Sequence, residues 1–341
     1  MSLPYLTQAQ APLTSEIDAV NESGELQKVS IPAERALTVY VDKRELVTLM
    51  TLGANPELLV LGYLRNQRLV RDVADIESIT VDWDVGAAAV KTVRGIEDIE
   101  EKTAHRVVTT GCGQGSVFGG LMDEVDQIAL PASACITQGQ LYGLVNTIRL
   151  KETTYKSAGS VHACALFSTA SGESEMLLFV EDVGRHNAID TIAGWMWMNM
   201  APTLVASRTA LRPEGAAAPE ARRSRFLGPG WQETSAATLI DPALAASDAA
   251  ASPSGTAGLV FYTTGRLTSE MVIKSAQMGV PAVVSRSGIT QMGHQVAQSV
   301  GLCAIGRATN KRFLCYTHAE RLKLEPGLVA STPSPSERWQ G

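Results

Sequence analysis

One cysteine of this chain lies in a setting that suits a reactive thiol. Cys112 stands between glycines in the run Gly111–Ser116 and follows an expected strand at residues 105–110. Glycine neighbours permit unusual backbone angles and leave the sulfur sterically open. A carrier thiol must reach one partner to be loaded and another to be unloaded, and its thiolate is the reacting form. Residue chemistry therefore makes Cys112 a candidate group carrier, with a loop cysteine that has no task as the alternative.

The remaining cysteines lie in or beside apolar runs. Free cysteine is a favoured core residue, so we expect these four to be small buried hydrophobes. The chain has five cysteines and no CxxC pair, which indicates neither a disulfide framework nor a zinc site. The four are Cys135, Cys164, Cys303 and Cys315.

Glycine and arginine occur together after four expected strands in the second half of the chain. Ligands of open α/β sheets bind beyond the carboxyl ends of the strands, where glycine admits the ligand and arginine fits phosphate oxygens. We therefore expect this edge to bind a phosphorylated or polyanionic ligand. The alternative is four ordinary turns whose arginines pair with nearby carboxylates. The pairs are Gly184-Arg185, Gly265-Arg266, Arg286 with Gly288, and Gly306-Arg307; the carboxylates are Glu181, Asp182, Asp190 and Glu270.

Two histidines are further candidates near this edge. His186 follows Arg185 in a polar loop, so a role at the ligand is more plausible there than for His162. His162 begins an apolar strand, where a buried and hydrogen-bonded histidine is the usual case. The absence of GxGxxG and GxxxxGK[ST] argues against a Rossmann dinucleotide site or a P-loop.

The elements that must position these residues predict an α/β protein. Residues 31–110 are expected to form a smaller, mostly antiparallel β domain with a helix that begins at Asn55-Pro56. In residues 132–322 strands alternate with helices, which predicts a layered domain with a mixed, largely parallel sheet covered on both faces. A Gly/Cys loop at 111–131 joins the two domains.

Three segments are expected to lie outside these domains. Residues 1–30 are interpreted as a disordered lead-in and residues 323–341 as a tail. Residues 204–256 are rich in Ala, Pro, Ser and Gly and indicate a low-complexity surface insertion. An alternative for that insertion is that its arginines contact an acidic partner; they are Arg222, Arg223 and Arg225.

Composition narrows the class of protein. A formal net charge of −6 and a pI near 5.5, without blocks of like charge, argue against a nucleic-acid-binding protein. No basic and apolar leader begins the chain, and no apolar run approaches the roughly 20 residues of a membrane helix. We expect a soluble cytoplasmic protein without a membrane partner.

The run Glu181–Asp190, which reads EDVGRHNAID, resembles the signature of the FdhD family, the formate dehydrogenase accessory sulfurtransferases. Other stretches match this family in order: Val161–Ala163, Thr264–Arg266, Ser269–Met271 and Gly306-Arg307. The resemblance covers roughly residues 30–203 and 257–322.

The resemblance implies a sulfurtransferase of molybdenum cofactor biosynthesis that acts as a persulfide carrier. Such a protein accepts sulfur from a cysteine desulfurase and passes it to molybdenum bis(molybdopterin guanine dinucleotide) before insertion into the formate dehydrogenase catalytic subunit. It also implies a homodimer, a C-terminal domain similar to the cytidine deaminase fold, and no tightly held metal.

Carried over by position, the resemblance makes Cys112 the persulfide carrier. The cofactor-contacting stretch falls on Gly306, Arg307, Ala308, Thr309, Asn310 and Lys311, beside the strand-end residues Gly265, Arg266, Arg185 and His186. Many members have a CxxC loop, whereas Gly115 stands here in place of the second cysteine. Sulfur transfer through this loop would therefore depend on one cysteine, without an intraloop disulfide.

Two other functions compete with sulfur transfer as interpretations of this sequence. A zinc deaminase needs HxE and PCxxC motifs, but Cys164 lies two residues after His162 and no PCxxC occurs. A non-catalytic chaperone that binds the molybdenum cofactor remains as the alternative, because only Cys112 distinguishes it from a carrier.

Overall fold

The structure is a computed structural model that describes residues 3–96, 99, 107–108, 115–116, 125, 128–151, 154–210 and 256–328. For residues 107–108, 115–116 and 201–210 only the backbone is described. Cys112, most of the expected loop at 111–131, residues 211–255 of the expected insertion and residues 329–341 of the expected tail lie outside this part.

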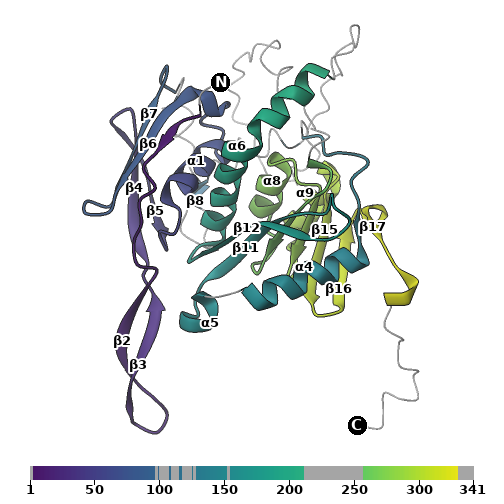
Figure 1. Cartoon of the computed structure of the whole chain (residues 1–341), viewed down its shortest axis with the longest axis horizontal. Helices are drawn as coiled ribbons and strands as arrows, with labels where there is room; N and C mark the ends of the chain where they lie inside the picture. Colours follow the sequence, from purple (N-terminus) through teal and green to yellow (C-terminus); the bar gives the residue numbers. More distant parts are fainter. Residues whose placement is uncertain are drawn as a thin grey trace, which may run out of the picture.

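The first half of the chain forms a five-stranded sheet with one helix against it (Figure 1). Asp42 and Lys43 form the predicted hairpin turn between two strands, with φ of 47° and 74°. The helix begins directly at Pro56, as predicted, although the Asn55 side chain makes no capping hydrogen bond. In sheet order the strands are β1 (Tyr5–Leu6), β6 (Ile76–Asp82), β7 (Ala87–Thr92), β4 (Arg35–Val41) and β5 (Arg44–Thr51), and the helix is α1 (Pro56–Asn66). A short 3-10 turn, η1 (Val73–Asp75), precedes β6.

The sheet is mostly antiparallel, as predicted, through the long β4–β5 and β6–β7 pairings, although β1 runs parallel to β6 and β7 runs parallel to β4. One expectation for this half is wrong. The segment expected to be a disordered lead-in contains β1 and a ribbon of β2 (Thr14–Val20) and β3 (Leu26–Pro32), which projects from the body (Figure 1). Long-range contacts explain the order, since the buried Glu57 carboxylate accepts hydrogen bonds from Thr7 Oγ1 and the Ala9 backbone N–H.

The second half forms a six-stranded sheet with helices on both faces (Figure 1). In sheet order its strands are β12 (Glu175–Asp182), β11 (His162–Ser168), β13 (Leu259–Thr263), β14 (Ala282–Ser285), β15 (Cys303–Thr309) and β16 (Arg312–Thr317). The helices are α4 (Gln138–Lys151), α5 (Thr154–Ala158), α6 (Arg185–Ala210), α8 (Ser269–Gln277) and α9 (Gln291–Val300). Two short strand pairs lie outside these sheets: β8 (Val107–Val108) pairs with β9 (Gly115–Ser116), and β10 (Ile136–Thr137) pairs with β17 (Leu322–Lys323). The short 3-10 turns are η4 (Ala319–Arg321) and η5 (Pro326–Leu328).

The prediction of a mixed second sheet is confirmed, but the expectation that this sheet is largely parallel is wrong. Only the β13–β14 and β14–β15 pairings are parallel, and β11, β12 and β16 enter the sheet antiparallel to their neighbours. The reason is that Thr169–Ser174 connects β11 to β12 directly, so no helix crosses over between them. The sheet is mixed, with a parallel centre.

Local capping agrees with the sequence at two helices. Thr137 and Gln140 form the predicted capping box of α4, since the Thr137 N–H donates to Gln140 Oε1 and the Gln140 N–H donates to Thr137 Oγ1. Thr290 caps α9 by accepting the Gly293 N–H at 3.1 Å. These bonds fix where both helices begin.

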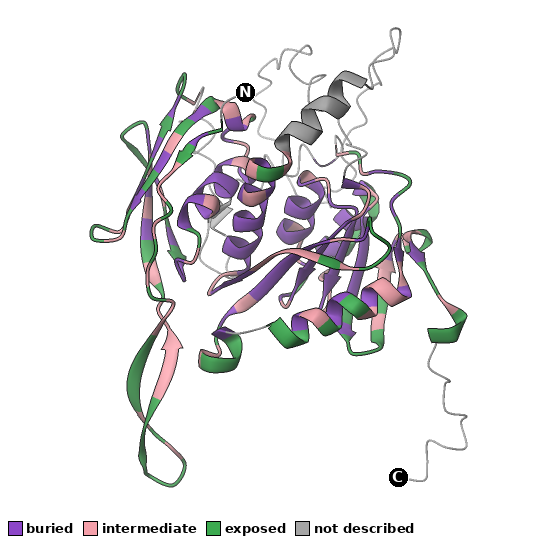
Figure 2. Ribbon diagram, viewed as in Figure 1, coloured by how far each residue is buried: buried purple, intermediate pink, exposed green. Residues whose placement is uncertain are grey.

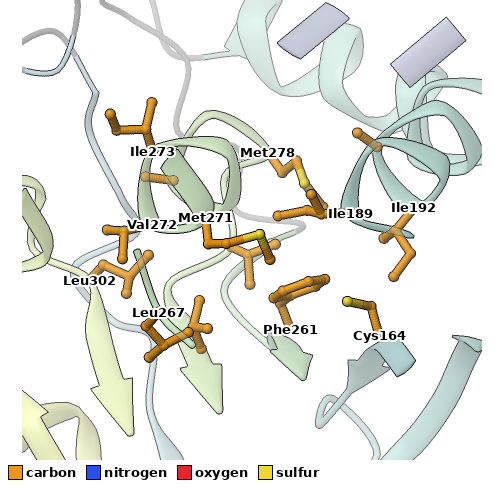
Figure 3. Packing of buried hydrophobic residues seen from close by; sticks show 14 of the residues in the cluster. Cys164, Ile189, Ile192, Phe261, Leu267, Met271, Val272, Ile273, Met278 and Leu302 are labelled. Carbon is orange, nitrogen blue, oxygen red and sulfur yellow. The ribbon is translucent and has the colours of Figure 1, made fainter. Parts of the chain in front are cut away.

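The central strands of the second sheet are buried on both faces (Figure 2). Phe261 of β13 packs among Ile189 of α6 and Met271 of α8 (Figure 3). Its neighbours Val260 and Tyr262 belong to the cluster on the other face, with Leu144 of α4. Alternation along one strand thus supplies both layers of the core.

The two sheets are joined by a close contact between α1 and α6. A Cβ atom on Gly62 would lie 1.6 Å from the Asp190 carbonyl oxygen, and one on Gly194 would lie 2.0 Å from the Leu58 carbonyl oxygen. The two helix backbones therefore touch, which places the first residues of α6 firmly between the sheets.

Candidate functional site

The arginine-bearing strand ends gather at one edge of the second sheet, as predicted. The strands β13, β14 and β15 are parallel, and β12 shares their direction because both β12 and β13 run antiparallel to β11. Backbone hydrogen bonds connect neighbouring ends: Arg286 N–H donates to the Thr263 carbonyl, and Arg307 N–H donates to the Ser287 carbonyl at 2.7 Å. We call this the arginine edge; it comprises His162, Arg185, Thr264–Arg266, Arg286–Gly288, Gly306 and Arg307.

The arginine edge is electropositive. Arg266, Arg286 and Arg307 are exposed, and His162 is half-buried at the start of β11. Burial lowers the pKa of His162, and the charges of Arg185 and Arg266 lower it further. Within the described part of the chain, Arg266 and Arg307 form no ion pair. An anion placed here would meet cations whose charge is not already neutralised.

The loop after β13 is tightly built around Arg185. A Cβ atom on Gly265 would lie 2.7 Å from Arg185 Cδ, so glycine is required for this approach. The Gly265 N–H donates to Thr263 Oγ1 at 3.1 Å, and its carbonyl accepts from Ser285 Oγ at 2.7 Å. Arg185 itself is 6% exposed, so its charge acts from beneath the surface.

Gly306 marks a second close approach. A Cβ atom there would lie 2.6 Å from Tyr316 Cε2 and 2.8 Å from the Ser287 carbonyl oxygen. Tyr316 is half-buried on β16 and was not among the predicted residues. Its sequence signal is the run Tyr316–His318, which follows Gly306-Arg307 as part of the same family resemblance.

The predicted stretch 306–311 runs from the arginine edge along the β15–β16 hairpin. Thr309, Asn310 and Lys311 are exposed near its turn, whereas Ala308 is buried in the cluster beside α4. The Lys311 carbonyl accepts a hydrogen bond from Tyr142 Oη, which connects the hairpin to α4. Contact of these residues with a ligand stays a prediction.

The start of the signature run connects the site to the first sheet. Asp182 accepts hydrogen bonds from Thr51 Oγ1 and the Leu52 N–H, and also from the Gly184 N–H and Asn187 Nδ2. Burial raises the pKa of Asp182, although each of these hydrogen bonds lowers it. The strand β5 therefore ends against the turn that presents Arg185.

Behind the arginine edge lies a buried charged cluster that sequence reasoning did not find. Lys274 Nζ lies 2.9 Å from Asp190 Oδ2 and 3.4 Å from Glu270 Oε1, and Asn66 Nδ2 donates to Asp190 Oδ1 at 2.7 Å. The cluster joins α1, α6 and α8. Its only sequence signal is a lysine that follows the apolar run Met271–Ile273.

His186 belongs to this buried charged cluster. Its Nε2 lies 3.5 Å from Glu270 Oε2, and the residue is 6% exposed. Burial lowers the pKa of His186 to about 3, against the pull of Glu270, so the ring is neutral at pH 7. Contact of His186 with a ligand stays a prediction. Its buried position behind Arg185 favours a role in holding the residues of the arginine edge in place.

The carboxylates proposed as alternative partners of the arginines have other partners. Asp190 and Glu270 pair with Lys274, and Asp182 accepts the four hydrogen bonds given above. Glu181 accepts the backbone N–H groups of Thr154 and Tyr155. Within the described part of the chain, the turns that carry Arg266 and Arg307 are therefore not closed by ion pairs with these carboxylates.

Cys112 lies outside the described residues. In the sequence it falls between β8 and β9, which pair antiparallel through Val107 with Ser116 and Val108 with Gly115. Among the residues that the structure describes, no group of three or more His, Cys, Asp or Glu side chains could hold a metal ion. The described helices include none long and apolar enough to cross a membrane.

Comparisons with known proteins agree with the signature run. The model of the FdhD/NarQ family matches residues 32–209 and 248–323. The sulfur carrier protein FdhD of Bacillus subtilis is 27% identical over 311 residues, which cover 89% of this chain and 94% of the relative. That of Wolinella succinogenes is 23% identical over 300 residues, covering 88% and 84%.

A solved structure supports the fold. A protein from Desulfotalea psychrophila, described as a formate dehydrogenase accessory protein, superposes with a TM-score of 0.62 at 18% identity. The match covers 91% of this chain and all of that one. At this identity the likeness concerns the fold alone.

Proposed function

Because the chain belongs to the FdhD/NarQ family, we propose that it is a sulfur carrier required for formate dehydrogenase activity. Cys112 accepts sulfur as a persulfide from a cysteine desulfurase. The protein then passes this sulfur to molybdenum bis(molybdopterin guanine dinucleotide), its bound substrate, before the substrate enters the formate dehydrogenase catalytic subunit.

The observation that carries the proposal is the arginine edge. The substrate has two guanylyl groups joined through phosphates, and Arg266 and Arg307 are exposed cations without an ion pair among the described residues. Gly265 and Gly306 are buried at the same edge, where the absence of a side chain lets Arg185 and Tyr316 pack closely against them. Charge-assisted hydrogen bonds from guanidinium groups are the strongest that a surface offers to phosphate.

The loading step needs only one thiol. The Cys112 thiolate attacks the outer sulfur of the desulfurase persulfide, the bond between that sulfur and the desulfurase cysteine breaks, and the desulfurase thiolate leaves. For delivery, a thiolate attacks the Cys112 sulfur, the bond between that sulfur and the outer sulfur breaks, and the outer sulfur leaves as sulfide while a disulfide to Cys112 forms. Because Gly115 replaces a second loop cysteine, the attacking thiol comes from outside the Cys112 loop.

The proposed function implies specific partners, a cellular location and an oligomeric state. A cysteine desulfurase and formate dehydrogenase are its partners, and it acts as a cytoplasmic homodimer. The layering of α4 on one face of the second sheet and α6, α8 and α9 on the other is compatible with a cytidine-deaminase-like arrangement. Sulfur transfer, rather than hydrolysis, follows from Cys112 and the arginine edge.

Maturation of formate dehydrogenase tests the proposal. In a bacterium that lacks its own family member, the wild-type chain is expected to restore formate dehydrogenase activity and Cys112→Ala is expected to restore none. Cys135→Ala is the matched control, because Cys135 is an exposed free thiol on the same chain. Full activity with Cys112→Ala would favour a non-catalytic cofactor-binding chaperone instead.

A further inference from the structure

Two cysteines that the proposed function does not use lie side by side at the edge of the second sheet. Cys303 begins β15 and is fully buried, while Cys315 lies on the edge strand β16 and is half-buried. Their Sγ atoms are 3.9 Å apart, and both side chains face the cluster beneath α4. The pair thus combines one thiol that solvent can reach with one that it cannot.

The hydrogen bonds of the pair give the two thiols different roles. The Cys303 S–H can donate to Cys315 Sγ, and the Cys315 S–H donates to the Thr317 carbonyl at 3.4 Å. The bond from Cys303 lowers the pKa of Cys315, and the same bond raises the pKa of Cys303. Cys315 therefore ionises first, and the thiolate is the form that reacts with oxidants.

The strand register leaves room for the sulfurs to meet. Ala304 pairs with Thr317 and Ile305 pairs with Cys315, so Tyr316 is an extra residue in a β-bulge of the edge strand. A disulfide requires the sulfurs to approach from 3.9 Å to about 2 Å. An edge strand has a neighbour on one side only, so it can make such a shift without displacing a second strand.

We propose that Cys303 and Cys315 form a redox-active dithiol that closes to a cross-strand disulfide when a hydroperoxide reaches Cys315. The Cys315 thiolate attacks the peroxide oxygen, the O–O bond breaks, and hydroxide leaves to become water, which gives a sulfenic acid. Cys303 sulfur then attacks Cys315 sulfur and expels the second water. Two thiols and one hydrogen peroxide become one disulfide and two waters.

The disulfide would close the hairpin that carries the stretch 306–311. Gly306 approaches Tyr316 across this hairpin. Gly306 follows Cys303 on β15, and Tyr316 is the next residue after Cys315 on β16. Oxidation is therefore expected to weaken binding of phosphorylated ligands at the arginine edge. This consequence rests on the proposed function, whereas formation of the disulfide does not.

Peptide mapping tests the dithiol. The purified full chain is treated with a few equivalents of hydrogen peroxide, quenched with an alkylating agent and digested without reduction. We expect a peptide in which Cys303 and Cys315 are joined with the loss of two hydrogen atoms, and its disappearance after dithiothreitol. Over-oxidation of Cys315 without the link, a link to Cys112 or Cys135 instead, or no reaction would overturn the proposal.

Variants separate the two roles and guard against misfolding. Cys303→Ser is expected to leave a sulfenic acid on Cys315 that dimedone traps, and Cys315→Ala is expected to leave Cys303 unmodified. Cys164→Ser is the control, because Cys164 is buried and bonded to Thr263 instead. Guanosine diphosphate affinity of the reduced and oxidised wild type is compared last: a linked protein with unchanged affinity would refute control of the edge while leaving the dithiol intact.

Discussion

Replacing Lys274 by methionine is expected to destabilise the protein more than any single exposed ion pair could. Lys274 lies between Asp190 and Glu270 with none of its side chain exposed, and Asp190 is equally buried. Methionine keeps most of the volume but leaves two buried carboxylates without their cation. Breaking a buried pair in this way typically costs about 3 to 5 kcal/mol in the free energy of unfolding.

The control is Lys91→Met on the exposed surface. Lys91 Nζ lies 2.6 Å from Glu77 Oε1, a shorter contact than in the buried charged cluster, but both side chains are more than half exposed. Water and salt screen such a pair, so its loss is expected to cost at most about 1 kcal/mol. Urea unfolding monitored by circular dichroism measures both variants, with unchanged slopes required for the comparison.

The pH dependence of the free energy of unfolding distinguishes the loss of the lysine charge from a change in side-chain volume. Burial alone would raise the pKa of Glu270, but the charge of Lys274 outweighs burial and holds the pKa of Glu270 below 4.5. Burial alone would lower the pKa of Lys274, but Asp190 and Glu270 raise the pKa of Lys274 above 10.5. The stabilisation that comes from Glu270 and Lys274 is therefore fully present between about pH 4.5 and 10.5 and is lost as the pH falls below or rises above that window, whereas burial raises the pKa of Asp190 despite Lys274. The gap between wild type and Lys274→Met should narrow below pH 4.5.

A combined variant completes this test. Adding Asp190→Asn and Glu270→Gln to Lys274→Met removes the stranded charges and is expected to recover part of the lost stability. A cost for Lys274→Met close to that of Lys91→Met, or one that does not change with pH, would refute the reasoning.

Three further predictions follow from the same contacts. Since burial lowers the pKa of His186 to about 3, the folded state should lose on the order of 1 kcal/mol per pH unit as the pH falls from 6.5, and His186→Gln should flatten that decline in urea unfolding. Gly62→Ala places a methyl group on the Asp190 backbone and should cost about 3 kcal/mol, whereas Gly143→Ala in α4, where the added Cβ would make only an ordinary contact with Ser174 at 3.9 Å, should gain up to about 1 kcal/mol; thermal unfolding compares them. Arg266→Ala with Arg307→Ala should weaken guanosine diphosphate binding at least about tenfold by calorimetry, and unchanged affinity would contradict the arginine edge.

Local patterns predicted the elements of the fold well. The turn at Asp42-Lys43, the helix start at Pro56 and the capping box of Thr137 with Gln140 all depend on neighbouring residues, and all are present. Strand direction and the order of residues 3–30 depend on partners far along the chain. Neighbouring residues give no signal for the pairing of β1 with β6 or for the hydrogen bond from Thr7 to Glu57.

The candidate site divides in the same way. The gathering of Arg266, Arg286 and Arg307 could be predicted, because a strand followed by Gly and Arg places the cation at a known edge. The buried charged cluster could not, since Lys274 meets Asp190 only after α6 and α8 pack together. The close approach of Gly265 to Arg185, and that of His186 to Glu270, likewise depend on tertiary packing, which the sequence does not display.

We propose above all that Cys112 carries sulfur, and the mass of the peptide that contains Cys112 tests this role most directly. The full chain is incubated with a cysteine desulfurase and cysteine, and persulfides are trapped with an alkylating agent before digestion. One added sulfur atom on the Cys112 peptide, lost in Cys112→Ala and absent from the exposed Cys135, is the predicted result. A Cys112 peptide without added sulfur, while the desulfurase itself is loaded, would contradict the account.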